Sequence, residues 1–193
     1  MTFDRDEVEA AFRTYWELGA VGEDWDAWCD SCFTEDVTYI EHVLGSKKGR
    51  EAVRAWIKPT MADYGEIYTA YVWHMVGDDG RVVVYMQNRR DNPEPGASPI
   101  DFPGITILQY AGNGQFSLEE DFWSLPEGTA TFKQYVDACK KFDPDHRHKR
   151  TRLDWGNGPA WTRGATTYAG SPGAQRPGAQ RPGAQRPGAQ RNA

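Results

Sequence analysis

The sequence lacks several features that define common classes of protein. No apolar run approaches the roughly 18 residues that mark a membrane-spanning helix. The first residues, MTFDRDEVEAAF, are acidic and contain no apolar core, so we expect no secretory signal. Three cysteines are few, and their odd number does not fit a disulfide framework. Together these absences predict a protein of the reducing cytoplasm.

Sequence signatures of cofactor binding are also missing. We find no Gly-rich phosphate loop, no serine-nucleophile elbow and no cluster of metal ligands. Cys29 and Cys32 have C-x-x-C spacing, but they fall on the apolar stripe of a predicted helix, and zinc would need two more ligands. We therefore expect core cysteines, no metal and no cofactor, so any catalysis would be acid–base chemistry on a small, largely apolar molecule.

The net charge of −6 is unevenly distributed along the chain. Residues 143–193 contain nine Lys and Arg and three Asp, a balance of +6, so the first 142 residues carry −12. An acidic body of this kind argues against a nucleic-acid-binding domain. The basic C-terminal part could contact an anionic partner, which the sequence does not identify.

Hydrophobic periodicity predicts an α+β fold. Helical spacing of apolar residues predicts helices over 4–19, 24–33, 50–61 and 127–142. A short strand at 37–43 and a turn at GSKKG precede the third helix. After residue 65 the period changes to two, which predicts four long antiparallel strands over 66–76, 81–91, 102–111 and 115–125. A curved antiparallel sheet with three N-terminal helices on its open side would enclose a cone-shaped pocket.

The chain divides into three parts by composition. Residues 1–142 carry the α+β cone domain, and residues 143–170 form a polar, Gly-rich extension. Residues 171–193 contain four copies of PGAQR, a unit with no apolar side chain larger than Ala. Because such a segment buries too little apolar surface to offset its ordering entropy, we predict a disordered tail.

The order of elements and two motifs, DWDAWCDSCFTEDVTYIEH and EEDFWSLPEG, resemble the SnoaL-like branch of the nuclear transport factor 2-like superfamily. The resemblance covers about residues 5–125. It implies a cystatin-like roll with a hydrophobic pocket. It does not imply one activity, because the superfamily includes ketosteroid isomerases, polyketide cyclases, limonene epoxide hydrolase and non-catalytic binders. Since the cone leaves sheet surface free for pairing, we also expect a homodimer.

A local similarity to ketosteroid isomerases implies particular site residues. YWELGAVGEDWDA is similar to their first-helix segment and places Tyr15 at the oxyanion-hole tyrosine. Glu41 then falls at the carboxylate general base, and Trp123 at a pocket-lining position. Thr106 falls near the third catalytic member, a protonated acid that threonine cannot match in strength. The similarity therefore implies a proton-transfer site of the same plan without that third member.

Strand alternation gives an independent argument about Glu41. It shares a strand face with Tyr39 and Val43, where a carboxylate would be desolvated and its pKa raised toward the range of a base. The alternative is that the strand ends at Ile40 and that Glu41 is solvated at the pocket mouth. His42 points the opposite way and is predicted to lie on the surface, and a later histidine in YVWHMV is expected to be partly buried and hydrogen-bonded.

The same alternation predicts a wall of the pocket from VYMQNRRD. Tyr85, Gln87 and Arg89 share one strand face, which would run from a dry floor to a wet mouth. Arg89 could pair with Glu119 or Asp121, an arrangement that resembles the water-activating site of limonene epoxide hydrolase. The alternative is a salt bridge on the sheet surface.

Aromatic residues are abundant, at 13% with eight Trp, and rigid rings of this kind often line pockets. The complete predicted pocket lining is Tyr39, Trp56, Trp73, Tyr85, Gln87, Arg89, Thr106, Glu119, Asp121 and Trp123.

Two functional hypotheses follow. In the first, Glu41 moves a proton on a hydrophobic carbonyl, polyketide or steroid-like ligand, and Tyr15 stabilises the developing oxyanion. Isomerisation, cyclisation and dehydration all begin with that step. In the second, the protein is a non-catalytic ligand-binding or dimeric assembly module of the same fold.

Overall fold

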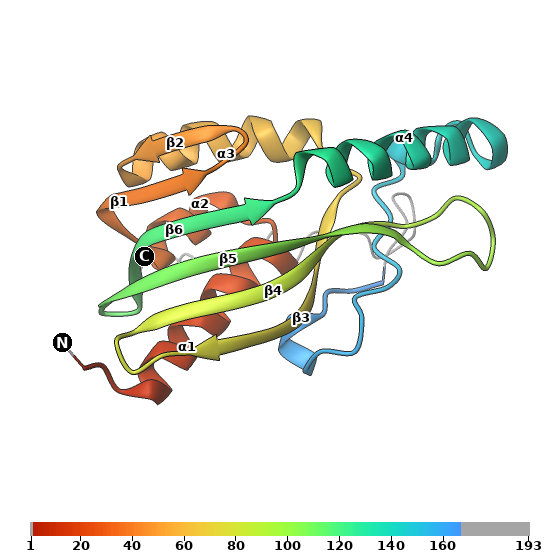
Figure 1. Cartoon of the computed structure of the whole chain (residues 1–193). Helices are drawn as coiled ribbons and strands as arrows, with labels where there is room; N and C mark the ends of the chain where they lie inside the picture. The colour runs from red at the N-terminus through yellow and green to blue at the C-terminus, as the bar shows by residue number, and fades with distance from the viewer. Residues whose placement is uncertain (1, 167–193) are drawn as a thin grey trace, which may run out of the picture.

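The computed structural model describes residues 2–166, and it has the α+β architecture expected from the sequence (Figure 1). The elements in chain order are α1 (Arg5–Trp16), the π-helical η1 (Glu17–Val21), α2 (Trp25–Cys32), β1 (Phe33–Glu41), β2 (Gly45–Lys48), α3 (Arg50–Asp63), β3 (Tyr68–Val76), β4 (Arg81–Arg90), β5 (Ile100–Gly112), β6 (Gln115–Trp123), α4 (Leu125–Phe142), and the 3-10 segments η2 (His146–His148) and η3 (Ala160–Thr162). Among these, no helix is long and apolar enough to cross a membrane.

The strands form one curved sheet in the order β2-β1-β6-β5-β4-β3. Neighbouring strands are antiparallel except β1 and β6, which run parallel, so the sheet is mixed and not purely antiparallel. Parallel pairing needs a long crossover connection, and everything between β1 and β6 supplies it. The segment GSKKG, predicted as a turn, contains all of β2, because its backbone pairs with β1, as in Thr38 with Lys48.

Helices α1, α2 and α3 cover one face of the sheet (Figure 1), and the main core lies between them. On α1, Phe12 and Trp16 lie one turn apart and are fully buried. On α2, burial raises the pKa of the Cys29 thiol to about 11 and that of Cys32 to about 12. Both thiols are free and buried, as expected for core cysteines.

The segment that follows α4 packs onto this body. The Trp161 ring contacts Phe12 edge-on, with ring centroids 5.9 Å apart, and Arg152 pairs with Glu23 at 2.8 Å. Trp155 is buried against Tyr68. Residues 151–162, within the predicted polar extension 143–170, therefore pack against the body of the fold. The predicted disordered tail, residues 171–193, lies outside the described residues.

Candidate functional site

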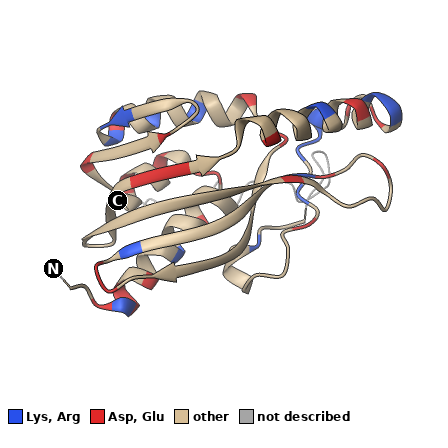
Figure 2. Cartoon of the chain, viewed as in Figure 1, with Lys and Arg blue, Asp and Glu red and all other residues tan. Residues whose placement is uncertain are grey.

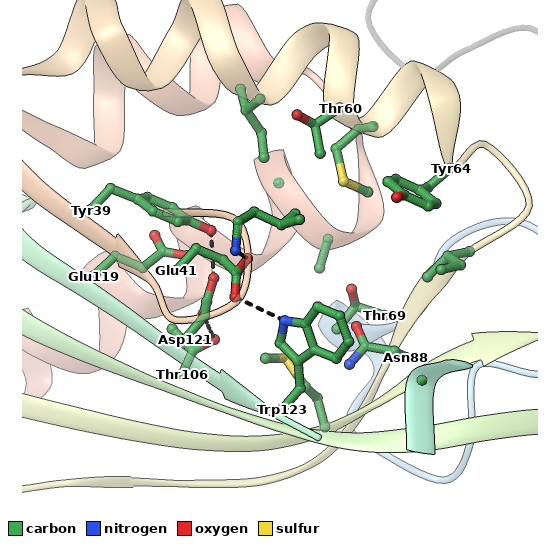
Figure 3. Close-up of a pocket in the computed structure, with 18 of the residues that line it drawn as sticks. Tyr39, Glu41, Thr60, Tyr64, Thr69, Asn88, Thr106, Glu119, Asp121 and Trp123 are labelled. Atoms are coloured by element: carbon green, nitrogen blue, oxygen red, sulfur yellow. Dashed lines mark hydrogen bonds between the residues drawn. The ribbon is translucent and has the colours of Figure 1, made fainter. Parts of the chain in front are cut away.

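A cavity of about 470 Å³ lies between the helix-covered face of the sheet, α3 and the first turns of α4 (Figure 3). Its walls are mainly apolar and aromatic, with Trp25 and Trp28 from α2, Trp56 from α3 and Trp123 from β6. A volume of this size is in the range of pockets that hold small organic molecules.

Three acidic side chains line one end of this cavity: Glu41 from β1, and Glu119 and Asp121 from β6. Register explains why they meet, because Glu41 is the cross-strand partner of Asp121 and Tyr39 is the partner of Glu119. Residues two apart on a strand share a face, so both acids of β6 point inward. Figure 2 shows this acidic stretch of β6 in the middle of the sheet.

Asp121 is the carboxylate most open to a ligand, since it is half-buried and lines the cavity. Its oxygens accept hydrogen bonds from two hydroxyl groups, Tyr39 at 2.5 Å and Thr106. Burial raises the pKa of Asp121 to about 6, although both hydrogen bonds act to lower it. The group therefore titrates close to neutral pH.

Glu119 is held in a different state by its surroundings. It is 2% exposed, and its Oε1 accepts a hydrogen bond of 2.7 Å from the Tyr15 hydroxyl. Within residues 2–166, its Oε2 has no hydrogen-bond partner. Burial, and then the charge of Asp121, raise the pKa of Glu119 well above its ordinary value. Burial therefore favours the neutral form of Glu119, in which Oε2 can carry a proton that has no acceptor among residues 2–166.

Glu41 is a hydrogen-bond acceptor for three N–H groups. Its carboxylate accepts from the Trp123 indole at 2.9 Å, the Val43 amide at 3.0 Å and the Leu44 amide at 2.5 Å. The residue is 3% exposed and β1 continues through it, so the alternative of a solvated Glu41 beyond a strand ending at Ile40 is wrong. Glu41 fixes the β1–β2 turn and the indole of Trp123.

Tyr15 also lines the cavity, but its hydroxyl is committed to Glu119. Burial raises the pKa of Tyr15 well above its ordinary value, so the hydroxyl remains a donor at all physiological pH. Tyr15, predicted at an oxyanion hole, therefore donates its hydrogen bond to Glu119 and not directly to a ligand.

The structure brings most of the predicted lining together. The residues that line the cavity are Tyr39, Trp56, Thr106, Glu119, Asp121 and Trp123. The predicted members that do not line it are Trp73, Tyr85, Gln87 and Arg89.

The error at these four positions is one of strand face. On β4 the side chains of Val84, Met86, Asn88 and Arg90 line the cavity, so Tyr85 and its odd-numbered neighbours point outward. Both faces of VVVYMQNRR run from apolar to polar, so alternation alone did not identify the inner one.

The outward residues make surface contacts of their own. Trp73 stacks on Tyr85 with ring centroids 5.7 Å apart, and a register shift in β3 before Trp73 helps to set its direction. Arg89 pairs with Asp101 at 2.6 Å and Asp154 at 3.2 Å, not with Glu119 or Asp121. The alternative of a salt bridge on the outer face of the sheet is the one observed.

The two histidines considered from sequence lie away from the cavity. His42 is exposed and lies 2.8 Å from Glu120, as predicted for a surface residue. His74 is partly buried between the Tyr71 hydroxyl at 2.8 Å and Glu9 at 2.6 Å, as expected for a hydrogen-bonded histidine.

Sequence reasoning missed a second polar group in the cavity. Thr69, Asn88 and Arg90 line it away from the acids, and Figure 3 shows Thr69 and Asn88 on the other side of Trp123 from Asp121. Correct assignment of the β4 face would have found Asn88 and Arg90 together, because they lie two residues apart.

The fold and this cavity define a cone-shaped α+β protein that encloses a site for a small ligand. The family model for the SnoaL-like domain matches residues 8–119, more than half of the chain. The chain therefore belongs to the SnoaL-like family, within the nuclear transport factor 2-like superfamily.

Solved structures with the same fold are similar at low identity. A putative polyketide cyclase from Xanthomonas campestris is 20% identical, with a TM-score of 0.53 over 66% of this chain and 97% of that one. The epoxide hydrolase/cyclase-like enzyme SalBIII, described in pyran ring formation in polyether salinomycin, is 19% identical, with a TM-score of 0.52 over 64% and 95%.

A hypothetical protein with a ketosteroid isomerase-like fold from Catenulispora acidiphila is 23% identical, with a TM-score of 0.51 over 61% of this chain and 88% of that one. At these identities the likeness establishes the fold alone. A comparison with curated proteins found no match.

Proposed function

We propose that the protein is a cofactor-independent enzyme that transfers a proton on a small, largely apolar carbonyl compound. The observation that carries the proposal is the pair of inward acids on β6. Asp121 has a pKa of about 6 and is accessible, whereas the pKa of Glu119 is raised well above its usual range, with a free donor. Two titratable groups with such different environments suit a base and an acid in one site.

The spacing of the two groups fits one substrate carbonyl. Residues two apart on a strand are separated by about 7 Å between Cα atoms. Asp121 would remove a proton from the carbon next to the carbonyl, while Glu119 donates a hydrogen bond to the oxygen that becomes negative. Isomerisation, cyclisation and dehydration share this step, and the structural neighbours include a putative polyketide cyclase and an epoxide hydrolase/cyclase-like enzyme.

The hydrogen-bond partners favour Asp121 over Glu41 as the base. The hydroxyls of Tyr39 and Thr106 can rotate and accept a hydrogen bond when Asp121 takes up a proton. The three N–H groups around Glu41 can only donate, and they already occupy both of its oxygens, so Glu41 is held as a structural acceptor. Glu41 was the base predicted from sequence, and a direct comparison of variants distinguishes the two assignments.

The test is exchange of substrate C–H for deuterium in D₂O, followed by NMR over a panel of aromatic polyketides, steroid enones and cyclic ketones. Asp121→Asn should lower the exchange rate at least about 100-fold, the usual scale for loss of a general base. Glu120→Gln is the matched control, because Glu120 is the next residue on β6 and contacts His42 on the outer face. If Asp121→Asn exchanges as fast as Glu120→Gln, the proposal fails.

As a second candidate function we propose that the protein is an assembly module, which forms a dimer through the outer face of its sheet. Four side chains form a row across the outer face, since Trp73 pairs with Tyr85, Tyr85 with Ile105, and Ile105 with Phe122. Trp73, Ile105 and Phe122 are each more than one third exposed. Contiguous exposed apolar surface of this kind marks interaction sites.

Light scattering during gel filtration tests this second proposal. The full chain should elute as a dimer, and Ile105→Lys, at the centre of the row, should convert it to a monomer. Phe142→Lys, at the end of α4, is the control and should leave the dimer intact. A monomeric wild type at every concentration would count against the assembly module.

The free buried thiols are in keeping with a cytoplasmic location, which we propose for the same protein.

A further inference from the structure

Arg90 is a buried cation in the cavity for which the acid–base mechanism has no use. It lies at the end of β4, is 2% exposed and lines the cavity. Its Nε and Nη1 atoms have no hydrogen-bond partner within residues 2–166. Buried donors without acceptors are unfavourable, and more so when charged, so native structures rarely keep them unless a ligand, an ion or ordered water completes the site.

The protein groups around Arg90 satisfy it only in part. Glu66 is also buried and lies 3.6 Å from Nε, which balances the charge at one edge of the guanidinium. The rings of Phe132 and Tyr135 lie 5.5 and 5.6 Å from its central carbon. They offer cation–π contact but no in-plane acceptor. The guanidinium is a planar fork of N–H donors. Its edge away from Glu66 can therefore donate hydrogen bonds to a second carboxylate.

The sheet register places Arg90 far from the acids. Arg90 pairs with Ile100 on β5, whereas Asp121 pairs with Thr106. Six residues of strand separate these two partners, a distance of about 20 Å. Between them, Phe102 lines the cavity. A ligand that contacts both ends is therefore elongated and apolar in its middle.

Charge sets the orientation of such a ligand. Glu41 and Asp121 repel a carboxylate at their end of the cavity, while Arg90 attracts one at the other end. Asn88 is two residues before Arg90 on the same face, and its cross-strand partner is Thr69. Both side chains line the cavity and can donate further hydrogen bonds to an oxygen.

We propose that Arg90 binds a carboxylate of the ligand, so that the substrate is an elongated apolar acid whose reacting carbonyl lies at Asp121. The proposal rests on the proposed function, because it assigns the far end of the same ligand. It gives Arg90 a role in substrate selection and orientation, separate from the proton transfer.

Quenching of tryptophan fluorescence by two matched compounds tests the proposal on the full chain near neutral pH. The probes are anthracene carboxylate and its methyl ester, which share the ring system and differ in the charged group. Wild type should bind the acid at least about tenfold more tightly than the ester, as expected for a charge-assisted bidentate contact. Arg90→Gln should abolish this preference while changing ester affinity less than about twofold.

Arg89→Gln is the matched control, because Arg89 is the adjacent arginine and pairs with Asp101 on the outer face. It should keep the wild-type preference for the acid. Arg90→Lys retains the charge without the fork and should show an intermediate preference. If Arg90→Gln does not fold, the comparison of acid and ester on wild type and Arg90→Lys still decides the matter.

Equal binding of acid and ester by wild type, or no binding of the acid, would overturn the proposal. An equal loss for both compounds in Arg90→Gln would do the same, since it indicates a structural role. Asp121→Asn separates this inference from the proposed function, because it should keep the preference for the acid while losing proton exchange. A retained preference without any effect of Asp121→Asn on exchange would instead refute the proposed function alone.

Discussion

The Tyr15 hydroxyl of α1 donates a hydrogen bond of 2.7 Å to Oε1 of Glu119 on β6, across a sequence separation of 104 residues. This bond joins the helix layer to the sheet at the acidic end of the cavity. It orients the carboxyl group so that one oxygen is bonded and the other, Oε2, has no partner among residues 2–166. The Glu119 carboxyl, whose neutral form burial favours, therefore lies in the cavity wall beside Asp121.

Glu119→Gln should stabilise the protein at neutral pH. Burial raises the pKa of Glu119 in the folded state. Above the unfolded pKa of about 4.5, folding must therefore take up a proton. The free energy of unfolding consequently falls as the pH rises from the unfolded pKa to the folded pKa. Glutamine mimics the protonated acid and removes this dependence. Thermal denaturation near neutral pH should therefore show a higher melting temperature for Glu119→Gln than for wild type.

Below about pH 4 wild type and Glu119→Gln should have similar stabilities, since Glu119 is then protonated in both states. The opposite result would be a free energy of unfolding that rises from pH 5 to pH 8 more steeply in wild type than in Glu119→Gln. It would contradict a raised pKa for Glu119.

Tyr39→Phe should shift the pH dependence of activity upward. The Tyr39 hydroxyl bond at 2.5 Å lowers the pKa of Asp121, so its removal should raise that pKa above about 6. The base works only when ionised, so kcat/KM of wild type should be half-maximal near pH 6, fall below that pH and rise toward a plateau above it. In Tyr39→Phe the fall should begin at higher pH, while Tyr110→Phe, which contacts Glu7, should leave the profile unchanged.

Glu41→Gln should reduce stability more than it reduces proton exchange. A glutamine has one acceptor oxygen for three N–H groups and adds an amide donor facing them, so the variant should lose about 1–3 kcal/mol. Chemical denaturation and deuterium exchange together check this. If Glu41→Gln instead abolishes exchange with little loss of stability, Glu41 is the base, as the sequence resemblance implied.

Trp161→Ala should destabilise the domain although residue 161 lies beyond α4. Its ring contacts Phe12 at 5.9 Å and Tyr71 at 5.6 Å between centroids, and Arg13 lies 5.5 Å from its centroid. Loss of a large packed aromatic typically lowers unfolding free energy by about 3 kcal/mol. Urea denaturation should show one cooperative transition at a lower midpoint, and an unchanged midpoint would mean that the segment is not part of the fold.

Much of the fold was predictable because local patterns specify it. Phe12, Trp16 and the α2 cysteines recur at helical spacing, and long alternating segments mark β3 to β6. The strand β2 was missed because GSKKG has no strand character of its own and becomes extended only by pairing with β1. The contacts of Trp161 were equally invisible, since they depend on partners far away in the chain.

The site was predictable in position more than in role. Glu119 and Asp121 share strand parity with Trp123, so sequence placed them in the pocket wall. Their protonation states depend on burial beneath α1 and on the Tyr15 hydroxyl, which no local pattern reports. Arg90 was overlooked because Arg89, its neighbour, is an equally polar residue on the opposite face.

Asp121 and Glu119 are proposed to titrate in different pH ranges, and carbon-13 NMR titration of the side-chain carboxyls measures this difference directly. One carboxyl should titrate near pH 6 and disappear in Asp121→Asn. A second carboxyl should titrate well above the ordinary range of a glutamate and should disappear in Glu119→Gln. If both carboxyls instead titrate near about pH 4, like ordinary exposed acids, the proposed acid–base pair does not exist.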